Sequence, residues 1–203
     1  MGTTIRTPTT AVLTLLAALL ALAACGETRP STFYTLTPET SEVPPDRGPS
    51  TGLNIGVGPT TLPQYINRPQ MVTRASPNRL QISEFNRWAE PIEDAVKRSV
   101  AEYISTSLGT DNVFILPRRQ TPRLDYRVTI DILQFDAGAD GRTTLAARWM
   151  IFKAREDEPR VTRRSVIRGQ ASDGGDYEAI ALALSTSLRT LADEIAAGIE
   201  ETY

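Results

Sequence analysis

The chain has 203 residues, a formal net charge of −2, one cysteine and no histidine. One cysteine cannot form an intramolecular disulfide, and without histidine the chain lacks Ser-His-Asp catalysis, Cys-His catalysis and the usual zinc ligands. The 22 basic and 24 acidic residues nearly balance and form no basic stripe, which argues against a nucleic-acid partner. We therefore expect no metal and no cofactor.

A short apolar run from Ala11 to Ala23 follows a weakly basic leader that carries Arg6. The run is too short to cross a bilayer as a helix and has the length of a secretory signal. It closes with Leu22-Ala23-Ala24-Cys25, which resembles the lipobox of bacterial lipoproteins. That resemblance implies that residues 1–24 are cleaved and that Cys25 receives the lipid, with palmitate among its acyl groups. The alternative is an ordinary signal peptide followed by a chance cysteine.

The segment after Cys25 predicts a tether followed by one domain. We expect residues 25–31 to be the lipidated tether and residues 32–203 to be the domain. Thr32 to Leu36 is rich in β-branched and aromatic residues, which indicates a strand. The prolines and glycines of residues 37–52 then predict a long loop inside the domain. If the strand were absent, the tether would instead extend to Gly52.

The next forty residues alternate between strand and turn signals. Leu53 to Val57 predicts a strand, and Gly58-Pro59 is expected to end it. Turn chemistry follows at residues 65–70. A hairpin is then predicted around Ser76-Pro77-Asn78, with arms at residues 70–74 and 79–83.

Helical spacing of apolar residues marks two long segments. The first starts at Glu90-Pro91 and stops at Gly109; the second starts near Asp176, with Asp173 or Asp176 as its cap. The residues between them predict strands at 112–116, 126–132, 143–153 and 160–171, a turn at 136–141 and a charged hairpin tip at 156–159. The last of these strands is polar on both faces, which is typical of an edge strand. The order predicts an α+β (mixed α/β) fold, a single domain with two main amphipathic helices on a largely antiparallel sheet.

Three motifs resemble one protein family. They are Phe33-Tyr34-Thr35-Leu36 after the predicted lipidated cysteine, Val57-Gly58-Pro59 with the stretch from Leu62 to Val72, and Asn86-Arg87-Trp88-Ala89-Glu90-Pro91 before the first helix. Together they resemble the ABC-type transport auxiliary lipoproteins, the PqiC-like group of membrane-integrity-associated transporter subunits. The resemblance covers nearly all of the chain after Cys25.

Membership of this family would imply a function without chemistry of its own. The expected role is that of a periplasmic lipoprotein that works with an MCE-type (mammalian cell entry) substrate-binding protein and an ABC transporter. Such systems move phospholipid or other hydrophobic molecules between the two membranes and support envelope integrity. Some relatives form rings, so a homo-oligomer is an open possibility. Gly26 follows the lipidated cysteine, and the usual sorting rule then favours the periplasmic side of the outer membrane over the inner membrane.

Five residues are candidates for contact with a partner: Tyr65, Arg68, Pro69, Gln70 and Trp88. A tyrosine and an arginine held on a loop by prolines give contact area at low entropic cost. The alternative is structural, with Tyr65 at the edge of the core and Arg68 paired with a nearby acid. Trp88 is either an interface anchor or a hydrophobic staple at the helix entry. Trp149, on an alternating strand, is expected in the core.

Carboxylates near the helix starts are the remaining candidates for catalysis. Glu90 with Glu93 or Asp94, and Asp173 with Asp176, could act as acid–base pairs, but negative charge at a helix N-terminus is explained by the helix dipole and by capping. We therefore predict that the protein is not an enzyme. The alternative function is an envelope-assembly or structural scaffold lipoprotein with no transport role.

Overall fold

The computed structural model describes residues 29–37, 52–120 and 122–202, so Cys25, the predicted signal peptide and most of the predicted 37–52 loop lie outside the described residues. The chain divides into two units, Met1–Pro30 and Ser31–Tyr203, and the fold is that of the second unit. Its strands and helices are β1 (Thr32–Tyr34), β2 (Ile55–Thr61), β3 (Gln70–Ser76), β4 (Arg79–Trp88), α2 (Ile92–Leu108), β5 (Val113–Ile115), β6 (Tyr126–Gly138), β7 (Arg142–Lys153), β8 (Val161–Gln170) and α3 (Tyr177–Glu200).

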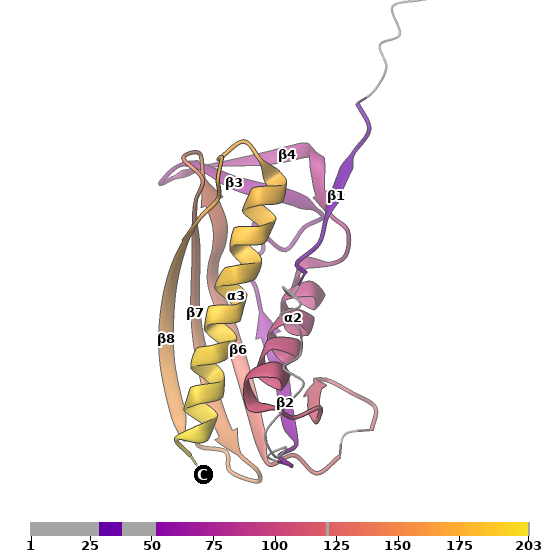
Figure 1. The fold of residues 1–203 in the computed structure, drawn as a ribbon, viewed down its shortest axis with the longest axis vertical. Coiled ribbons are helices and arrows are strands. Elements are labelled where there is room, and N and C mark those ends of the chain that lie inside the picture. Colours follow the sequence, from indigo (N-terminus) through magenta and orange to yellow (C-terminus); the bar gives the residue numbers. More distant parts are fainter. Residues whose placement is uncertain (1–28, 38–51, 121, 203) are drawn as a thin grey trace, which may run out of the picture. The chain divides into compact units, whose positions relative to one another are not determined.

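Strand β6 is the centre of an eight-stranded mixed sheet. One edge of β6 pairs along its length with β7, which pairs in turn with β8. Its other edge is shared: residues 126–131 pair with β2, and Ala137 and Gly138 pair with β3. The strands β2–β5 and β3–β4–β1 thus extend the sheet from the two ends of β6 (Figure 1).

The predicted α+β single domain is confirmed, and its sheet is more mixed than expected. The long ladders β6–β7 and β7–β8 and the hairpin β3–β4 are antiparallel. The ladders β1–β4, β2–β5, β2–β6 and β3–β6 are parallel. Parallel partners lie far apart in the sequence, so local alternation could not reveal them.

Both helices pack on the same side of the sheet, as Figure 1 shows. Helix α2 contacts β2 and β5, α3 contacts β6, β7 and β8, and the two helices contact each other. Helix α2 begins after Pro91 and ends at Gly109, which has φ 61° and supplies the left-handed stop that the sequence predicts. Asp176 caps α3 by accepting hydrogen bonds from the backbone N–H groups of Glu178 and Ala179. Neither helix of the described residues is long and apolar enough to cross a membrane.

The core lies between the helices and the sheet. Trp149 is fully buried there, as predicted, and its indole N–H donates to Ser165 Oγ over 2.9 Å. Ser165 in turn donates to a carboxylate oxygen of Glu194 on α3. The only polar atom of the indole therefore has a partner, and the contact also joins β7, β8 and α3.

The prediction that Gly58-Pro59 ends a strand is wrong. Strand β2 continues through this pair to Thr61, with a shift of register against β6 between Val57 and Thr60. The Gly58–Pro59 bond is cis, and Gly58 has φ 132°. A Cβ atom at Gly58 would lie 2.7 Å from the carbonyl oxygen of Leu116, so no other residue fits here. The pair is a bulge within a strand, where glycine and proline are both tolerated.

The prediction of a turn from Asp136 to Gly141 is partly wrong. Strand β6 continues to Gly138, and the turn follows it, with the Gly141 N–H donating to the Gly138 carbonyl over 3.0 Å. Asp136 is therefore a strand residue, and only 2% of its surface is exposed. A buried carboxylate is costly without partners, and one of its partners, Tyr65, lies in the loop that the sequence singles out.

Candidate functional site

The loop between β2 and β3 is fastened to the sheet by the buried carboxylate of Asp136. Tyr65 donates its hydroxyl to Asp136 Oδ2 over 3.1 Å, and Arg74 Nη2 forms an ion pair with the same oxygen at 2.7 Å. Gln134 donates to Asp136 Oδ1 over 2.8 Å. The Arg74 guanidinium also lies 5.8 Å from the centre of the Tyr65 ring. Asp136 thus connects the loop to β6 through side chains and reinforces the backbone pairing of β3 with β6.

Burial and a neighbouring negative charge raise the pKa of Tyr65. Desolvation of the hydroxyl, with the Asp136 charge as the second cause, raises the pKa of Tyr65 from 10.0 to about 12. The neutral phenol is therefore the form that the fold requires, because only a protonated hydroxyl donates to Asp136. This geometry supports the structural interpretation of Tyr65 that the sequence left open.

The other four predicted contact residues lie next to one another at the β3–β4 end of the sheet. The Trp88 N–H donates to the Pro69 carbonyl over 2.7 Å, and Gln70 is the register partner of Arg87. Trp88 has 8% of its surface exposed, so its indole serves the core. Pro69 is exposed, whereas Arg68 and Gln70 are half-buried. Contact of these residues with a partner stays a prediction.

Arg68 carries the one unsatisfied donor of this loop. Its Nε atom is buried and has no hydrogen-bond partner among the described residues, although its backbone N–H donates to Ile66 over 2.8 Å. A buried donor without an acceptor costs about 1–3 kcal/mol. The acid that the sequence analysis offered as a partner for Arg68 is not found in the described part of the chain.

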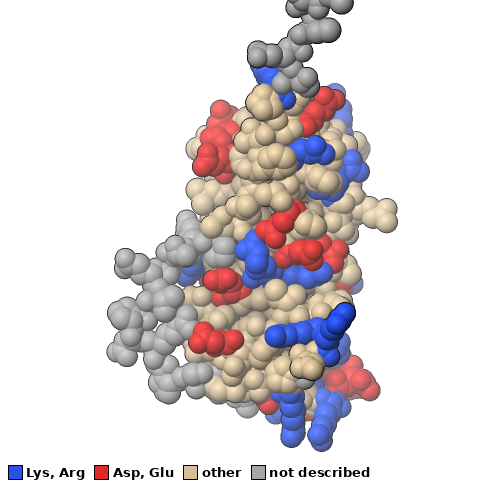
Figure 2. Space-filling view, turned by 90° about the vertical axis from the view of Figure 1, so that its right-hand side faces the viewer, with Lys and Arg blue, Asp and Glu red and all other residues tan. Residues whose placement is uncertain are grey.

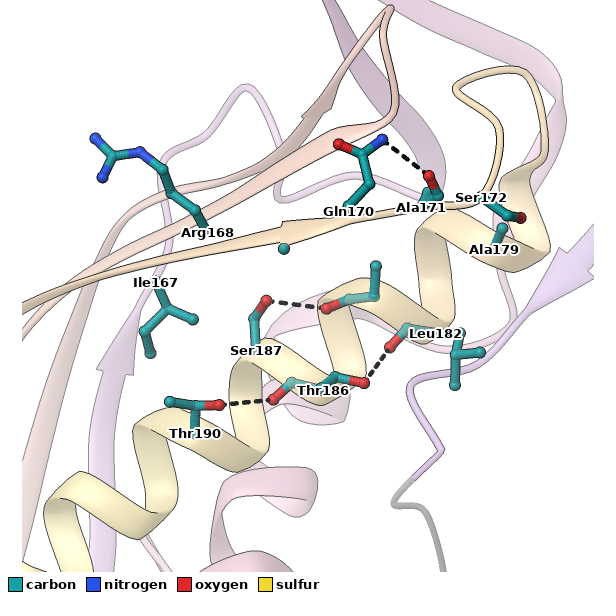
Figure 3. Close-up of a pocket in the computed structure, with 12 residues that line it drawn as sticks. Ile167, Arg168, Gln170, Ala171, Ser172, Ala179, Leu182, Thr186, Ser187 and Thr190 are labelled. Carbon is teal, nitrogen blue, oxygen red and sulfur yellow. Dashed lines mark hydrogen bonds between the residues drawn. The ribbon is translucent and has the colours of Figure 1, made fainter.

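A groove that sequence reasoning missed runs between the edge strand β8 and helix α3 (Figure 3). It has a volume of about 380 Å³. Its walls are mostly small or apolar, with Ile167 and Gly169 on β8 and Ala179, Leu182, Ala183 and Ser187 on α3. Strand β8 pairs only with β7, so the described residues leave its outer edge open along this groove.

The hydroxyl groups on the α3 wall of the groove are turned towards their own helix. Thr186 donates to the Leu182 carbonyl over 3.1 Å, Ser187 to Ala183 over 2.9 Å and Thr190 to Thr186 over 3.3 Å, as the dashed lines in Figure 3 show. These side chains therefore present carbon to the groove and keep no donor free for it. The surface suits an apolar or extended segment better than a small polar ligand.

Leu182 forms the ridge between this groove and a second hollow. The second hollow, of about 390 Å³, lies between β1 and α3 and includes Phe33, Glu178 and Ser185. Leu182 is 54% exposed and Phe33 is 62% exposed. A signal for this surface was present in the sequence, because Leu182 falls outside the three-and-four spacing that defines the buried stripe of α3.

The described residues hold no candidate metal site. No group of three or more Asp, Glu or Cys side chains gathers there in a way that could hold an ion. Glu90 pairs with Arg98, Glu93 pairs with Lys97, and Asp173 and Asp176 accept hydrogen bonds from backbone N–H groups. The carboxylates considered for acid–base chemistry are thus used in ion pairs and helix caps.

The match to a family model decides the family. The model of the ABC-type transport auxiliary lipoprotein component matches residues 34–196. The chain belongs to this family. The resemblance found in the sequence motifs is thereby confirmed, and the matched residues include the 65–70 loop, the groove, α2 and most of α3.

Solved structures share the fold of this family member. A protein of Xanthomonas campestris assigned to the DUF330 family has 20% identity and a TM-score of 0.69, covering 85% of this chain and 99% of its own. A crystal structure of an uncharacterized protein has 15% identity and a TM-score of 0.68, covering 84% of this chain and 99% of its own. At these identities the likeness establishes the fold alone. No curated protein matches the chain.

Proposed function

We propose that the protein is a lipid-anchored periplasmic subunit of an ABC transport system, acting with an MCE-type substrate-binding protein. Its cargo would be phospholipid or another hydrophobic molecule, and its activity would support envelope integrity. The observation that carries the proposal is the family match over residues 34–196. Lipidation of Cys25 and attachment to the outer membrane belong to the same proposal, because the lipobox and Gly26 favour them.

The geometry supports a binding role for this subunit. The groove offers an open strand edge, an apolar ridge at Leu182 and hydroxyls that are already satisfied. An extended segment of a transporter subunit could add to the edge of β8 and place its apolar side chains against α3, which is a common mode of peptide recognition. Pro69, which is exposed in the loop before β3, would offer a second contact. A homo-oligomer is compatible with either surface.

Co-purification from native membranes tests this function. We expect the tagged full chain, extracted with mild detergent, to bring down the ATPase, the permease and an MCE-type protein, identified by mass spectrometry. Leu182→Glu should reduce their recovery at least tenfold, because it places a charge on the ridge of the groove. The matched control is Ile82→Glu on β4, since Ile82 is also exposed, at 46% against 54% for Leu182.

Two outcomes would contradict the proposal. Recovery of no transporter subunit, under conditions that keep other transporter complexes intact, would reject the transport role. Recovery of envelope-assembly proteins alone would favour the scaffold alternative. Equal losses for Leu182→Glu and Ile82→Glu would leave the transport role standing and reject the groove as the contact surface.

A further inference from the structure

We propose that the outward face of strands β7 and β8 docks onto an anionic phospholipid bilayer. Residues that alternate along β7, such as Trp149, point towards the helices and are fully buried. The residues between them point the other way, so Arg148 on β7 and its register partner Arg164 on β8 lie on the side of the sheet without helices. Arg168, the register partner of Thr144, lies on the same side. We call Arg148, Arg164 and Arg168 the arginine face.

Figure 3 shows the direction of one of these side chains. Arg168 extends away from α3 on the opposite side of β8, while Ile167 and the helix residues face the groove. All three arginines are exposed, and none has a hydrogen bond or an ion pair among the described residues. Arg168 is also one of the residues that line the groove, so the arginine face adjoins the groove along strand β8.

The arrangement of charges on the arginine face does not favour the stability of the folded chain. Arg148 and Arg164 are directly opposite in an antiparallel ladder, and like charges at such positions repel. On the other side of Arg148, its β6 partner Asp131 offsets part of the charge while accepting a hydrogen bond from Thr61 over 2.8 Å. Arg164 and Arg168 have no carboxylate as a register partner. An external anion would relieve this repulsion.

The composition of this face sets it apart from the rest of the chain. The chain as a whole has a net charge of −2, yet the outward positions of β7 and β8 include no aspartate or glutamate. Two apolar side chains belong to this face: Val166, 45% exposed, lies between Arg164 and Arg168, and the half-buried Met150 lies beside the Arg148–Arg164 pair. Arg164 and Arg168 are four residues apart on one strand, a distance of about 13 Å.

A bilayer of anionic phospholipid matches these features. Guanidinium groups bind phosphate oxygens bidentately, and arginines near an anionic membrane surface add to its attraction. A sheet face presents its side chains as a broad array, which fits the planar array of lipid phosphates. Arg168 lies near the carboxyl end of β8, where the groove shares Leu182 with the hollow beside β1. The inference rests on the proposed membrane location, although its test does not require acylation.

Vesicle binding tests the inference directly. The chain from residue 25 onwards with Cys25→Ser cannot be acylated, and it retains the whole compact unit of residues 31–203 with its core. We expect it to sediment with vesicles of phosphatidylcholine and phosphatidylglycerol, not with phosphatidylcholine alone, and to be released by high salt. The double variant Arg164→Glu/Arg168→Glu should bind at least tenfold more weakly.

The control variant makes the same change of net charge elsewhere. Arg79→Glu/Arg119→Glu alters two exposed arginines outside the arginine face and should bind like the parent chain. No binding to anionic vesicles, or equal loss in both double variants, would overturn the inference. Binding of polyglutamate without binding of vesicles would also overturn it, and would assign the face to an acidic protein. A double variant that loses vesicles yet still co-purifies transporter subunits supports the inference and leaves the proposed function intact.

Discussion

Tyr65, Arg74 and Asp136 join the loop before β3, strand β3 and the distant strand β6 through one buried carboxylate. Each of the two carboxylate oxygens accepts at least one hydrogen bond, and Arg74 balances the charge. This buried side chain, at 2% exposure, thus has the hydrogen-bond partners and the opposite charge that its burial requires. At the residue scale, the loop that resembles a partner-binding motif is also a structural clamp.

The pH dependence of stability should report this clamp. Because burial and Asp136 raise the pKa of Tyr65 to about 12, the folded state holds the phenol proton more tightly than the unfolded state. The stabilisation from Tyr65 is fully present below about pH 10 and is lost as the pH rises towards about 12. We expect Tyr65→Phe to cost about 1 kcal/mol at neutral pH and to lose part of this deficit above about pH 10. Urea unfolding of both proteins across this range measures it, and parallel profiles would reject the clamp.

Helix α3 is the element that shapes both hollows and covers the core. Its buried stripe packs on β6, β7 and β8, while Leu182 and the small residues beside it remain available on its first half. The helix begins at a single side-chain cap, since Asp176 accepts from the N–H groups of Glu178 at 2.9 Å and Ala179 at 3.1 Å. The position of the groove thus depends on where α3 starts.

Removal of the cap should weaken α3 measurably. We expect Asp176→Ala to lower the free energy of unfolding by about 1 kcal/mol, because two backbone donors lose their acceptor. Asp176→Asn should be nearly neutral, since asparagine caps about as well. Asp173→Ala is the comparison within the same loop, where the carboxylate accepts only from the Gly175 N–H. A larger loss for Asp173→Ala in denaturant titration would show that the cap has been assigned to the wrong residue.

At the scale of the whole molecule, strand β1 attaches the start of the domain to strand β4. Thr32–Tyr34 pairs in parallel with Asn86–Trp88, and the Ala89 N–H donates to the Tyr34 carbonyl over 2.8 Å. Leu36 is fully buried, and its carbonyl accepts from Ser99 Oγ over 3.3 Å. The predicted strand at residues 32–36 is therefore part of the fold, although strand β1 itself covers only Thr32–Tyr34. That the 37–52 segment is a loop inside the domain stays a prediction.

Cleavage of that segment should leave the domain in one piece. A protease site introduced between residues 38 and 51 allows a cut on the carboxyl side of β1. We expect the amino-terminal fragment, which carries β1 and Leu36, to stay bound after the cut. It should separate only in denaturant, because the pairing of β1 with β4 and the burial of Leu36 persist. Size-exclusion chromatography of the cut protein measures this. Release of the fragment under native conditions would instead favour a tether that extends to Gly52.

Local sequence signals predicted the helices and strands well, but they predicted poorly which distant residues contact one another. The start and end of α2 follow from Pro91 and Gly109, and the start of α3 follows from Asp176, because each of these residues acts within one turn of its helix. The burial of Asp136 could not be foreseen, since its partners lie 62 and 71 residues away. Nor could the continuation of β2 through Gly58-Pro59, because it depends on the approach of Leu116.

The sequence by itself determined the family, the α+β class, the order of the elements and the exclusion of histidine and disulfide chemistry. These properties depend on composition, periodicity and motifs along the chain. Only the tertiary structure decided that Tyr65 serves a clamp, that β8 and α3 leave a groove, and that three arginines share one open face. Each of those features requires residues from separate strands and helices to meet, and their pairing is set by packing and register between distant segments.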